Sequence, residues 1–386
     1  MINPFRPGNG IEPKYLAGRQ EYIESFEKSL KSYESGLPRN AVLSGLRGTG
    51  KTVLLKHFKI VAEARGWITV EREFGERFSD ESAFAEAVAN DVVSKASEIS
   101  LAKKIKESGR RIFNFAKPAE LGGYGVTYKP YYKTKKQLLD DYLKDLFMKN
   151  WNVFEKSGHK GVVFLYDEFH TVRDRKDTKS FPLGSLLGAL SNAQRNGCNY
   201  YLCLSGLPIV KSNLKQAKTY TERMFDFREV GNLSSEQARE AVSNTLGGSG
   251  HEFEAPLIER IVSETRGYPY FLQFYGYFAI ESITKRKVSL KDFLSMRSRL
   301  IRELDASFFE GRFNAASSKE KAVLEAIAKI GEMNVETNQI IRTSKIEHGT
   351  LMQLLIRLVE KGLLYRSSRG KYSFTLPLFR DYLLRH

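Results

Sequence analysis

Short apolar runs alternate with longer amphipathic stretches over residues 1–231 of this chain. The runs that predict strands are Ala41–Ser44, Trp67–Val70, Val162–Tyr166, Asn199–Leu204 and Phe227–Val230. Between them, apolar residues recur at helical spacing, as in Glu21–Lys31 and Leu183–Arg195. Continuous apolar runs are typical of strands buried on both faces, so the series predicts an α/β fold with a doubly wound parallel sheet.

The pattern becomes helical after this region. Ser234 and Gln237 have the spacing of a capping box, and a second helix is predicted over Ala255–Glu264. The turn Gly267-Tyr268-Pro269 opens a third helix, because proline is favoured in the first helical turn. These elements predict a helical lid, followed by a bridge over Val288–Glu310.

The last part of the chain has a different pattern of elements. Three helices are predicted over Ser317–Ile330, Glu336–Thr343 and His348–Lys361, and two strands over Leu363–Tyr365 and Tyr372–Thr375. A basic turn joins the two strands, and this order is typical of a winged helix-turn-helix. We therefore expect a core over 1–231 with an insertion at about 74–147, a lid and linker over 232–311, and the winged helix over 312–386.

A glycine-rich motif follows the first predicted strand directly. Residues 45–52 read GLRGTGKT and match G-x-x-x-x-G-K-[ST] between a strand and a helix. We expect backbone N–H groups of this loop to surround phosphate oxygens, with Lys51 reaching the β- and γ-phosphates and the Thr52 hydroxyl ligating Mg²⁺. The predicted nucleotide-binding residues are Gly45, Leu46, Arg47, Gly48, Thr49, Gly50, Lys51, Thr52 and Val53.

Two carboxylates end the strand at Val162–Tyr166. Ligands of open α/β sheets bind at the carboxyl ends of strands, so Asp167 is predicted to hold Mg²⁺ through water. Glu168 is predicted to orient or deprotonate an attacking water, which favours hydrolysis over transfer to another acceptor. His170 is expected to be a structural or signalling neighbour, because no second His or Cys lies at ligand spacing.

The next strand along the chain ends at Ser205. A hydroxyl at that position would sense the γ-phosphate or hold the water, or it would simply belong to a tight turn before Pro208. Both interpretations stay open at the level of sequence.

Composition adds a partner class to this picture. The chain has 386 residues, a net charge of +16 and an isoelectric point of about 9.5. Twenty Lys and Arg residues and eleven Asp and Glu residues lie from Lys285 to the C-terminus. The basic excess favours nucleic acid, DNA in particular, or an acidic membrane surface as a partner, with a surface charge that serves only solubility as the alternative.

Other features bear on location. Only Cys198 and Cys203 are present, which is no disulfide framework and fits a reducing cytosol. No apolar run reaches the roughly 18 residues of a membrane span. We expect a soluble cytoplasmic protein without membrane contact.

The segment Ala119–Tyr132 is rich in Gly and Tyr and is predicted to form a hairpin or ordered loop. It would offer a stacking surface for nucleic acid, or it would pack as a structural hairpin. Scattered aromatic residues do not distinguish the two.

These motifs together resemble the AAA+ ATPases, and within them the archaeal-type and STAND-like group related to origin-recognition initiators. Leu16–Arg19 is similar to the family's N-terminal motif beside the adenine, which implies nucleotide contacts for Gly18 and Arg19. Residues 45–52 resemble its Walker A motif, Asp167 and Glu168 its Walker B motif, and Ser205 falls at sensor 1.

The resemblance also implies residues outside the core motifs. Arg223 stands where the family keeps its arginine finger, with Arg228 as a competitor. Gly267-Tyr268-Pro269 resembles the Gly-x-Pro that replaces the usual sensor-2 arginine, which implies a nucleotide contact for Pro269 and leaves Arg266 as a neighbour.

The resemblance implies an ATP- and Mg²⁺-dependent switch that self-assembles or binds a partner protein, on DNA, with ATP hydrolysed to ADP. A nucleotide-gated signalling or defence scaffold without DNA contact is the alternative. A third hypothesis is a small-molecule kinase. It is disfavoured because Glu168 beside Asp167 is better suited to activating water than to transferring phosphate to a small molecule.

Overall fold

The computed structural model describes residues 2–107, 138–283, 285–331 and 333–386. The chain forms two compact units. One contains Gln20–Ser44 and Leu54–Glu229, and the other contains Met1–Arg19, Gly45–Val53 and Val230–His386. The predicted hairpin at Ala119–Tyr132 lies outside the described residues.

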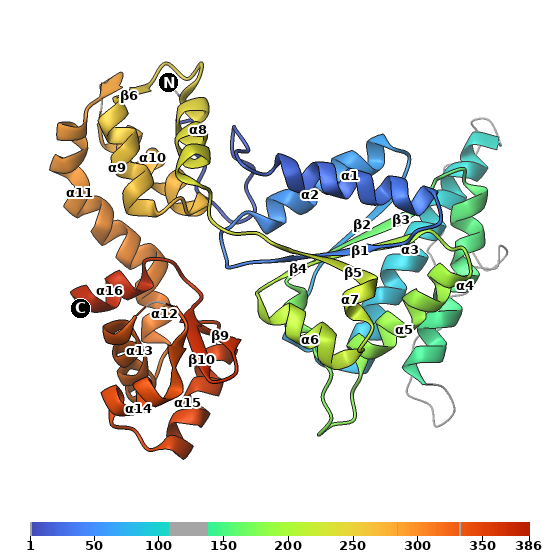
Figure 1. Ribbon diagram of the computed structural model, residues 1–386. Coiled ribbons are helices and arrows are strands. Elements are labelled where there is room, and N and C mark those ends of the chain that lie inside the picture. The colour runs from blue at the N-terminus through green and yellow to red at the C-terminus, as the bar shows by residue number, and fades with distance from the viewer. Residues whose placement is uncertain (1, 108–137, 284, 332) are drawn as a thin grey trace. The chain divides into compact units, whose positions relative to one another are not determined.

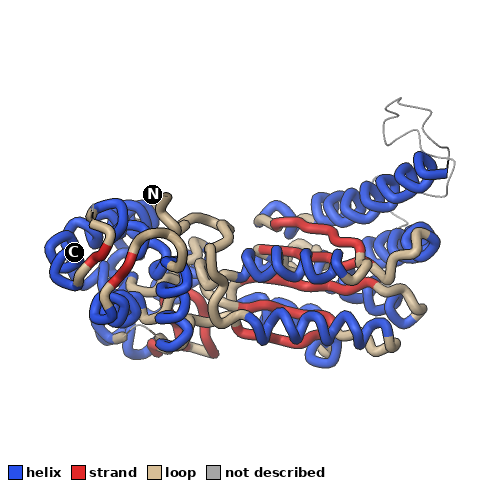
Figure 2. Tube along the Cα trace, turned by 90° about the horizontal axis from the view of Figure 1, so that it is seen from above, coloured by secondary structure: helices blue, strands red, loops and turns tan. Residues whose placement is uncertain are grey.

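A five-stranded sheet forms the centre of the first unit (Figure 2). Its strands are β1 (Asn40–Ser44), β2 (Ile68–Glu73), β3 (Val162–Asp167), β4 (Tyr200–Gly206) and β5 (Phe225–Glu229). They lie in the order β2-β3-β4-β1-β5, and every neighbouring pair is parallel. The predicted parallel sheet is confirmed, and all five predicted strands are present.

The strand boundaries differ from the prediction by up to three residues, most clearly in β2 and β5. β2 continues through Glu71, Arg72 and Glu73, which pair with β3 as far as Asp167, and β5 begins at Phe225 rather than Phe227. Both extensions follow the hydrogen-bonded ladder of a neighbouring strand. The polar side chains at these strand ends gave no hydrophobic signal in the sequence. They do not interrupt the strands, because the ladder is formed by backbone groups.

Helices cover both faces of this sheet (Figure 1). One face carries α1 (Gln20–Glu34) and α2 (Lys51–Ala64), and the other carries helices that include α5 (Pro182–Arg195) and α6 (Ile209–Ala217). Adjacent residues of β4 contact different helical layers, because successive strand side chains point to opposite faces of the sheet. The ring centroid of Tyr201 lies 5.3 Å from that of Phe26 of α1, and the ring centroid of Tyr200 lies 5.1 Å from that of Phe147 of α4 (Leu139–Lys156).

The described ends of the 74–147 segment belong to the core. They form α3 (Glu81–Glu107) and α4 (Leu139–Lys156), preceded by a 3₁₀ turn at Glu76–Ser79. Val88 and Val92 of α3 and Leu143 of α4 are fully buried in the cluster that covers β3 and β4. This segment therefore contributes helices that the sheet needs for burial on that face.

The second unit contains a helical group formed by α8 (Ser235–Leu246), α9 (Ala255–Thr265), α10 (Pro269–Ser282) and α11 (Leu290–Leu304), with a small parallel sheet of β6 (Glu252–Phe253) and β7 (Lys287–Val288). The predicted capping box is confirmed: the Gln237 N–H donates to Ser234 Oγ at 3.2 Å, and the Ser234 N–H donates to Gln237 Oε1 at 3.0 Å. The N-terminal segment packs here through Phe5, which stacks on Phe253.

A π-helical turn, Asp305–Glu310, and α12 (Gly311–Asn314) lead into the last group of elements. This group contains α13 (Ser318–Ile330), β8 (Val335–Glu336), α14 (Thr337–Ser344), α15 (His348–Glu360), β9 (Leu364–Ser368), β10 (Lys371–Phe374) and α16 (Phe379–Arg385). Its sheet is antiparallel in the order β8-β10-β9.

Helices α13, α14 and α15 lie where the sequence predicts helices, within one residue at each end, and the sheet is larger than predicted. Strands β9 and β10 extend into the expected basic loop and leave a turn at Arg369 and Gly370, where Gly370 has φ +73°. Strand β8 and helix α16 were not predicted, and the two residues of β8 are too few for a visible alternation. The winged-helix interpretation and the three-part division of the chain stay predictions.

No helix among the described residues is both long enough and apolar enough to cross a membrane.

Candidate functional site

The glycine-rich loop occupies the turn between β1 and α2. It begins at Gly45, directly after β1, and α2 begins at Lys51. A Cβ at Gly45 would stand 2.3 Å from the carbonyl oxygen of Val230, so only glycine fits there. Gly50 has φ +94°, a conformation that side chains with a Cβ rarely adopt. The loop backbone is therefore fixed by glycine at both its start and its end.

Lys51 is buried within this loop and is 5 % exposed. Its Nζ donates to the carbonyl oxygens of Gly45 at 3.0 Å and Leu46 at 2.8 Å, and the Thr49 hydroxyl also donates to Leu46 O. Two carbonyl oxygens of the loop therefore accept hydrogen bonds from this ammonium group. An anionic phosphate would be a stronger acceptor than these carbonyls, because charge-assisted hydrogen bonds are the stronger class.

The first turn of α2 supplies further groups suited to an anion. It contains no acidic residue and includes Thr52 and Val53. The N–H groups and the dipole of this 14-residue helix favour negative charge at its start. Thr52 offers a hydroxyl oxygen, a ligand type that Mg²⁺ accepts.

Arg19 contacts the loop itself. The side chain is 4 % exposed, and its Nη2 donates to Thr49 O at 3.0 Å and to Gly231 O at 2.7 Å. The neighbouring Gly18 has φ +60°, and a Cβ there would stand 2.6 Å from Gln237 Cδ. Arg19 therefore links the N-terminal segment to the loop backbone. The expected contact of Gly18 and Arg19 with a nucleotide stays a prediction.

Pro269 is the first residue of α10, as the sequence predicts. The turn before it is held to the start of the lid, since the Leu233 N–H donates to Gly267 O at 2.9 Å. Arg266 lies in the same turn with φ +51°, and its Nη2 is 3.1 Å from Asp381 Oδ2 of α16. This arginine forms an ion pair with a carboxylate of the C-terminal helix. Whether Pro269 contacts a nucleotide stays a prediction.

The acidic pair stands at the end of β3 in the other unit. Asp167 is 8 % exposed, and its Oδ1 accepts the Glu168 N–H at 2.8 Å. Glu168 has φ +51°, in the left-handed region that costs a non-glycine residue about 1–2 kcal/mol. The Thr171 N–H and hydroxyl both donate to Glu168 O, at 3.1 and 2.9 Å, and hold this conformation. Such backbone strain is concentrated at functional sites.

His170 lies next to this carboxylate. Its Nε2 is 3.8 Å from Glu168 Oε2, and the side-chain amide of Asn213 donates to His170 O at 3.1 Å. A Cβ at Gly206 would stand 3.1 Å from the His170 Cβ. The histidine therefore lies between the acidic turn and the end of β4.

Ser205 lies on β4 at the same edge of the sheet. It pairs with Leu43 of β1, and it directly follows Leu204, whose partner on β3 is Tyr166. Asp167 directly follows Tyr166, so the serine and the aspartate end neighbouring strands at one level. The Ser205 side chain is fully buried, and its Oγ has no hydrogen-bond partner among the described residues. A buried unpartnered hydroxyl needs an explanation, and a missing ligand or water supplies one.

The two arginine-finger candidates differ in their partners. Arg228 lies on β5 with its Nε 2.7 Å from Asp226 Oδ2. Arg223 lies on α7 (Thr221–Met224), is exposed, and forms no ion pair within the described part of the chain. An exposed arginine without an acidic partner is the one that can reach another molecule.

Two residues near the loop were missed by the sequence analysis as functional groups. Tyr268 was noted only as the middle of the Gly267–Pro269 turn, and Arg312 of α12 lies in a linker with no motif. A Cβ at Gly48 would stand 2.4 Å from the Tyr268 hydroxyl oxygen. No sequence signal could have placed Arg312, because its position depends on the packing of the linker.

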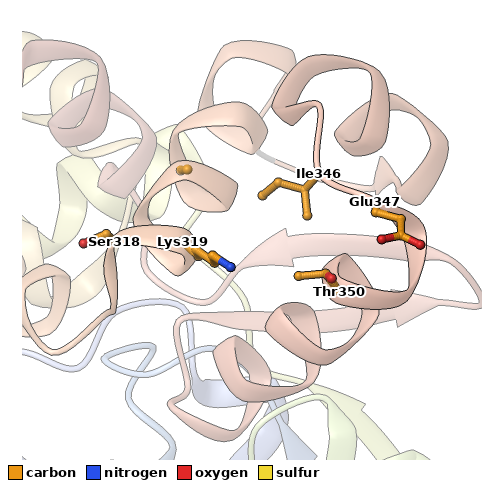
Figure 3. Close-up of a pocket in the computed structure, with 6 residues that line it drawn as sticks. Ser318, Lys319, Ile346, Glu347 and Thr350 are labelled. Atoms are coloured by element: carbon orange, nitrogen blue, oxygen red, sulfur yellow. The ribbon is translucent and has the colours of Figure 1, made fainter.

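A separate hollow of about 430 Å³ lies between the starts of α13 and α15 (Figure 3). Its lining residues are Ser318, Lys319, Ala322, Ile346, Glu347 and Thr350. None of the predicted site residues lines it.

Comparison with known proteins agrees with this geometry. Residues 15–196 match the family described as AAA ATPase domain, and residues 306–383 match a domain of unknown function. No curated protein matches the chain.

Solved structures with a similar fold include a Walker-type ATPase of Pyrococcus abyssi, which is 16% identical, with 99% of each chain covered and a TM-score of 0.62. The Aeropyrum pernix ORC1 protein in complex with DNA is 15% identical, with 97% of this chain and 94% of that one covered and a TM-score of 0.47. The Thermotoga maritima RuvB branch migration motor is 12% identical over 97% and 99% of the two chains, with a TM-score of 0.45.

Proposed function

We propose that this chain, whose residues 15–196 match the AAA ATPase domain, works as an ATP-driven molecular switch that self-assembles and binds DNA. The observation that carries the nucleotide part is the β1–loop–α2 junction. There Gly45 and Gly50 fix the loop, and Lys51 is buried over carbonyl oxygens that a phosphate would replace. Bound ATP would bias one of two arrangements of the lid, and hydrolysis would reset it.

The acidic turn is proposed to supply the hydrolytic step. Glu168 would accept a proton from the attacking water at its carboxylate, and the strained backbone at φ +51° would hold that carboxylate in a fixed direction. Ser205 would donate its unpartnered hydroxyl to the γ-phosphate or the water. The Thr52 hydroxyl and the Asp167 carboxylate are each of a ligand type that Mg²⁺ prefers, and Mg²⁺ would neutralise charge on the transferred phosphoryl group.

The DNA-binding part of the proposal is supported by the exposed turn between β9 and β10. Arg366 and Arg369 are exposed there, and Arg357 is exposed on α15. A basic hairpin beside a helix is suited to touch phosphates while the helix enters a groove. Self-assembly is supported by Arg223, whose exposed guanidinium would neutralise charge in the site of a neighbouring subunit.

One observation favours the alternative of a nucleotide-gated scaffold without DNA contact. The exposed side of α15 carries Ile356, which is 54% exposed, and Arg357 is its only Lys or Arg. An apolar exposed residue on this helix suits a protein partner better than base edges.

The proposed function is tested by comparing ATP binding and turnover of the parent with those of Glu168→Gln and Lys51→Ala. We expect Glu168→Gln to bind ATP as the parent does and to lose at least about a hundredfold in turnover, since general-base groups contribute about that much or more. Lys51→Ala should lose binding. If Glu168→Gln hydrolyses ATP at the parental rate, the role of Glu168 is wrong. If the parent does not bind adenine nucleotides, the switch itself is wrong.

A further inference from the structure

A cluster of polar groups lies beside Gly48 of the phosphate loop and includes residues outside the motif. The Tyr268 hydroxyl lies beside Gly48, where an added Cβ would be 2.4 Å from it. Tyr268 is fully buried, and its hydroxyl has no hydrogen-bond partner among the described residues. Leaving a buried hydroxyl unpaired costs about 1–3 kcal/mol, so this position favours a ligand that can accept a hydrogen bond.

Two arginines lie near this hydroxyl. Arg47 and Arg312 each lower the pKa of Tyr268, although burial, the largest influence, raises it above its ordinary value. The pKa of Arg312 is lowered by burial and by the charge of Arg47. The geometry agrees: a Cβ at Gly48 would be 3.2 Å from Tyr270 Cβ, and the Tyr270 ring lies 5.1 Å from that of Phe308, over which Arg312 lies. Arg47 directly precedes Gly48, so both arginines belong to the surroundings of the unpartnered hydroxyl.

Neither arginine has an acidic partner in the described part of the chain. Arg312 donates to the carbonyl oxygen of Phe308 and lies over that ring, with Cζ 4.6 Å from the centroid. The groups that act on its charge are Arg47, Tyr268 and Tyr270, none of them a carboxylate. Half-buried like charges without a counter-ion repel each other, so the arrangement is stabilised by an anion.

We propose that Arg47, Arg312 and the Tyr268 hydroxyl receive the terminal phosphate of a nucleotide held on the phosphate loop. This inference rests on the proposed ATP binding. A triphosphate carries one phosphate more than a diphosphate, so a site for the terminal phosphate would distinguish the two nucleotides.

The same residues connect the phosphate to the elements that follow. Arg312 stacks on Phe308, whose ring lies 5.1 Å from that of Tyr270 and belongs to the π-helical turn. The Arg47 guanidinium borders Gly362, between α15 and β9, where an added Cβ would be 3.2 Å from Nη1. An anion that draws Arg47 and Arg312 together would therefore act on both the linker and the C-terminal domain.

The test measures the affinities of the full chain for ADP and for a slowly hydrolysed ATP analogue. Arg312→Gln and Tyr268→Phe are compared with the parent, and Arg302→Gln of α11, an exposed arginine of the same linker, is the matched control. We expect Arg312→Gln to lose about tenfold in affinity for the analogue, about 1.4 kcal/mol, with ADP unchanged within about twofold. Tyr268→Phe should shift the ratio in the same direction by a smaller factor, and Arg302→Gln should not shift it.

Several results would overturn the inference. If Arg312→Gln keeps the parental ratio of the two affinities while its melting temperature is unchanged, the cluster does not read the terminal phosphate. Equal losses for both nucleotides would also overturn it. In a further measurement, ADP binding is compared with and without added inorganic phosphate. If phosphate tightens ADP binding to the parent but not to Arg312→Gln, the cluster binds a free anion instead. A parent that binds no nucleotide would refute the proposed function, which is a separate result.

Discussion

Arg19 donates a hydrogen bond to the carbonyl oxygen of Thr49 at 3.0 Å, and this bond ties the N-terminal segment to the phosphate loop. The same guanidinium donates to Gly231 O at 2.7 Å. One buried side chain therefore joins three stretches of chain that are far apart in sequence. A loop held in this way needs less ordering when a phosphate binds, and preorganisation of that kind raises affinity.

Arg19→Gln should weaken the binding of ATP and ADP about equally, by roughly tenfold, because hydrogen bonds to a charged group contribute about 1.5–3 kcal/mol. Titration with a fluorescent nucleotide measures both affinities. Arg6→Gln, an exposed arginine of the same segment, should leave them unchanged. A loss confined to ATP would show that Arg19 reads the terminal phosphate rather than holding the loop.

Ser205→Ala should separate stability from turnover. The hydroxyl is buried without a partner, so its removal should leave the melting temperature unchanged or raise it. Turnover should fall by about tenfold or more, since one positioned hydrogen-bond donor contributes at least that much at a transition state. Ser191→Ala on α5 is the control. Unchanged turnover would show that Ser205 is only a structural residue of the turn before Pro208 and has no role in hydrolysis.

Arg223 should act on the site of a neighbouring subunit. Arg223→Ala should lower turnover by about a thousandfold, the lower end of what an arginine finger contributes. Arg228→Ala, which removes the Asp226 ion pair, should change turnover little. Mixing Arg223→Ala with Glu168→Gln should restore activity, because a mixed interface contains one intact pair. No restoration on mixing would contradict action between subunits.

Arg366→Gln combined with Arg369→Gln should weaken DNA binding at all sequences. Each phosphate contact contributes about −0.9 to the slope of log K against log salt, so the slope should become less negative by about 1.8. The matched control is Lys291→Gln with Arg302→Gln, two exposed basic residues of α11. If the parent shows no DNA binding at about 50 mM salt, with or without ATP, the scaffold alternative is favoured.

The buried pair Glu320–Lys361 should make the C-terminal domain sensitive to acid. Glu320 is 2 % exposed and lies 2.6 Å from Lys361 Nζ. Burial would raise the pKa of Glu320, but the hydrogen bonds from Lys361 and Ser317 outweigh it and lower the pKa below its ordinary value. The folded state therefore binds this proton less readily than the unfolded chain. The stabilisation is complete above the unfolded pKa of about 4.3 and is lost as pH falls through the lower, folded pKa.

Lys361→Met should lower the melting temperature at pH 7, with a cost of about 1–3 kcal/mol for a buried carboxylate that loses its partner. The difference from the parent should shrink as the pH falls below about 4, where the carboxylate is protonated. Lys371→Met is the control, because its partner Glu336 has a side chain that is 52% exposed, and exposed pairs contribute little. A difference that does not depend on pH would show that Lys361 acts through packing.

Local sequence patterns determined the elements that depend on near neighbours. The strand before Gly45, the helix after Lys51 and the capping box of Ser234 and Gln237 each follow from a few adjacent residues, and the structure has all three. The acidic pair was found for the same reason, because an apolar run and the carboxylates that end it are contiguous. Boundaries were less exact where backbone pairing continued past the apolar side chains, as at Glu73 of β2.

The tertiary structure alone decided what those elements contact. The sequence implied a nucleotide contact for Arg19, and the fold placed its guanidinium on the loop backbone at Thr49. It placed Tyr268 beside Gly48 and Arg312 near Arg47, although no motif links these residues. Backbone periodicity and motif spacing are local properties that a sequence displays directly. Charged groups and hydroxyls that are far apart in sequence come together only when the helices pack. Their contacts are therefore a property of the whole chain.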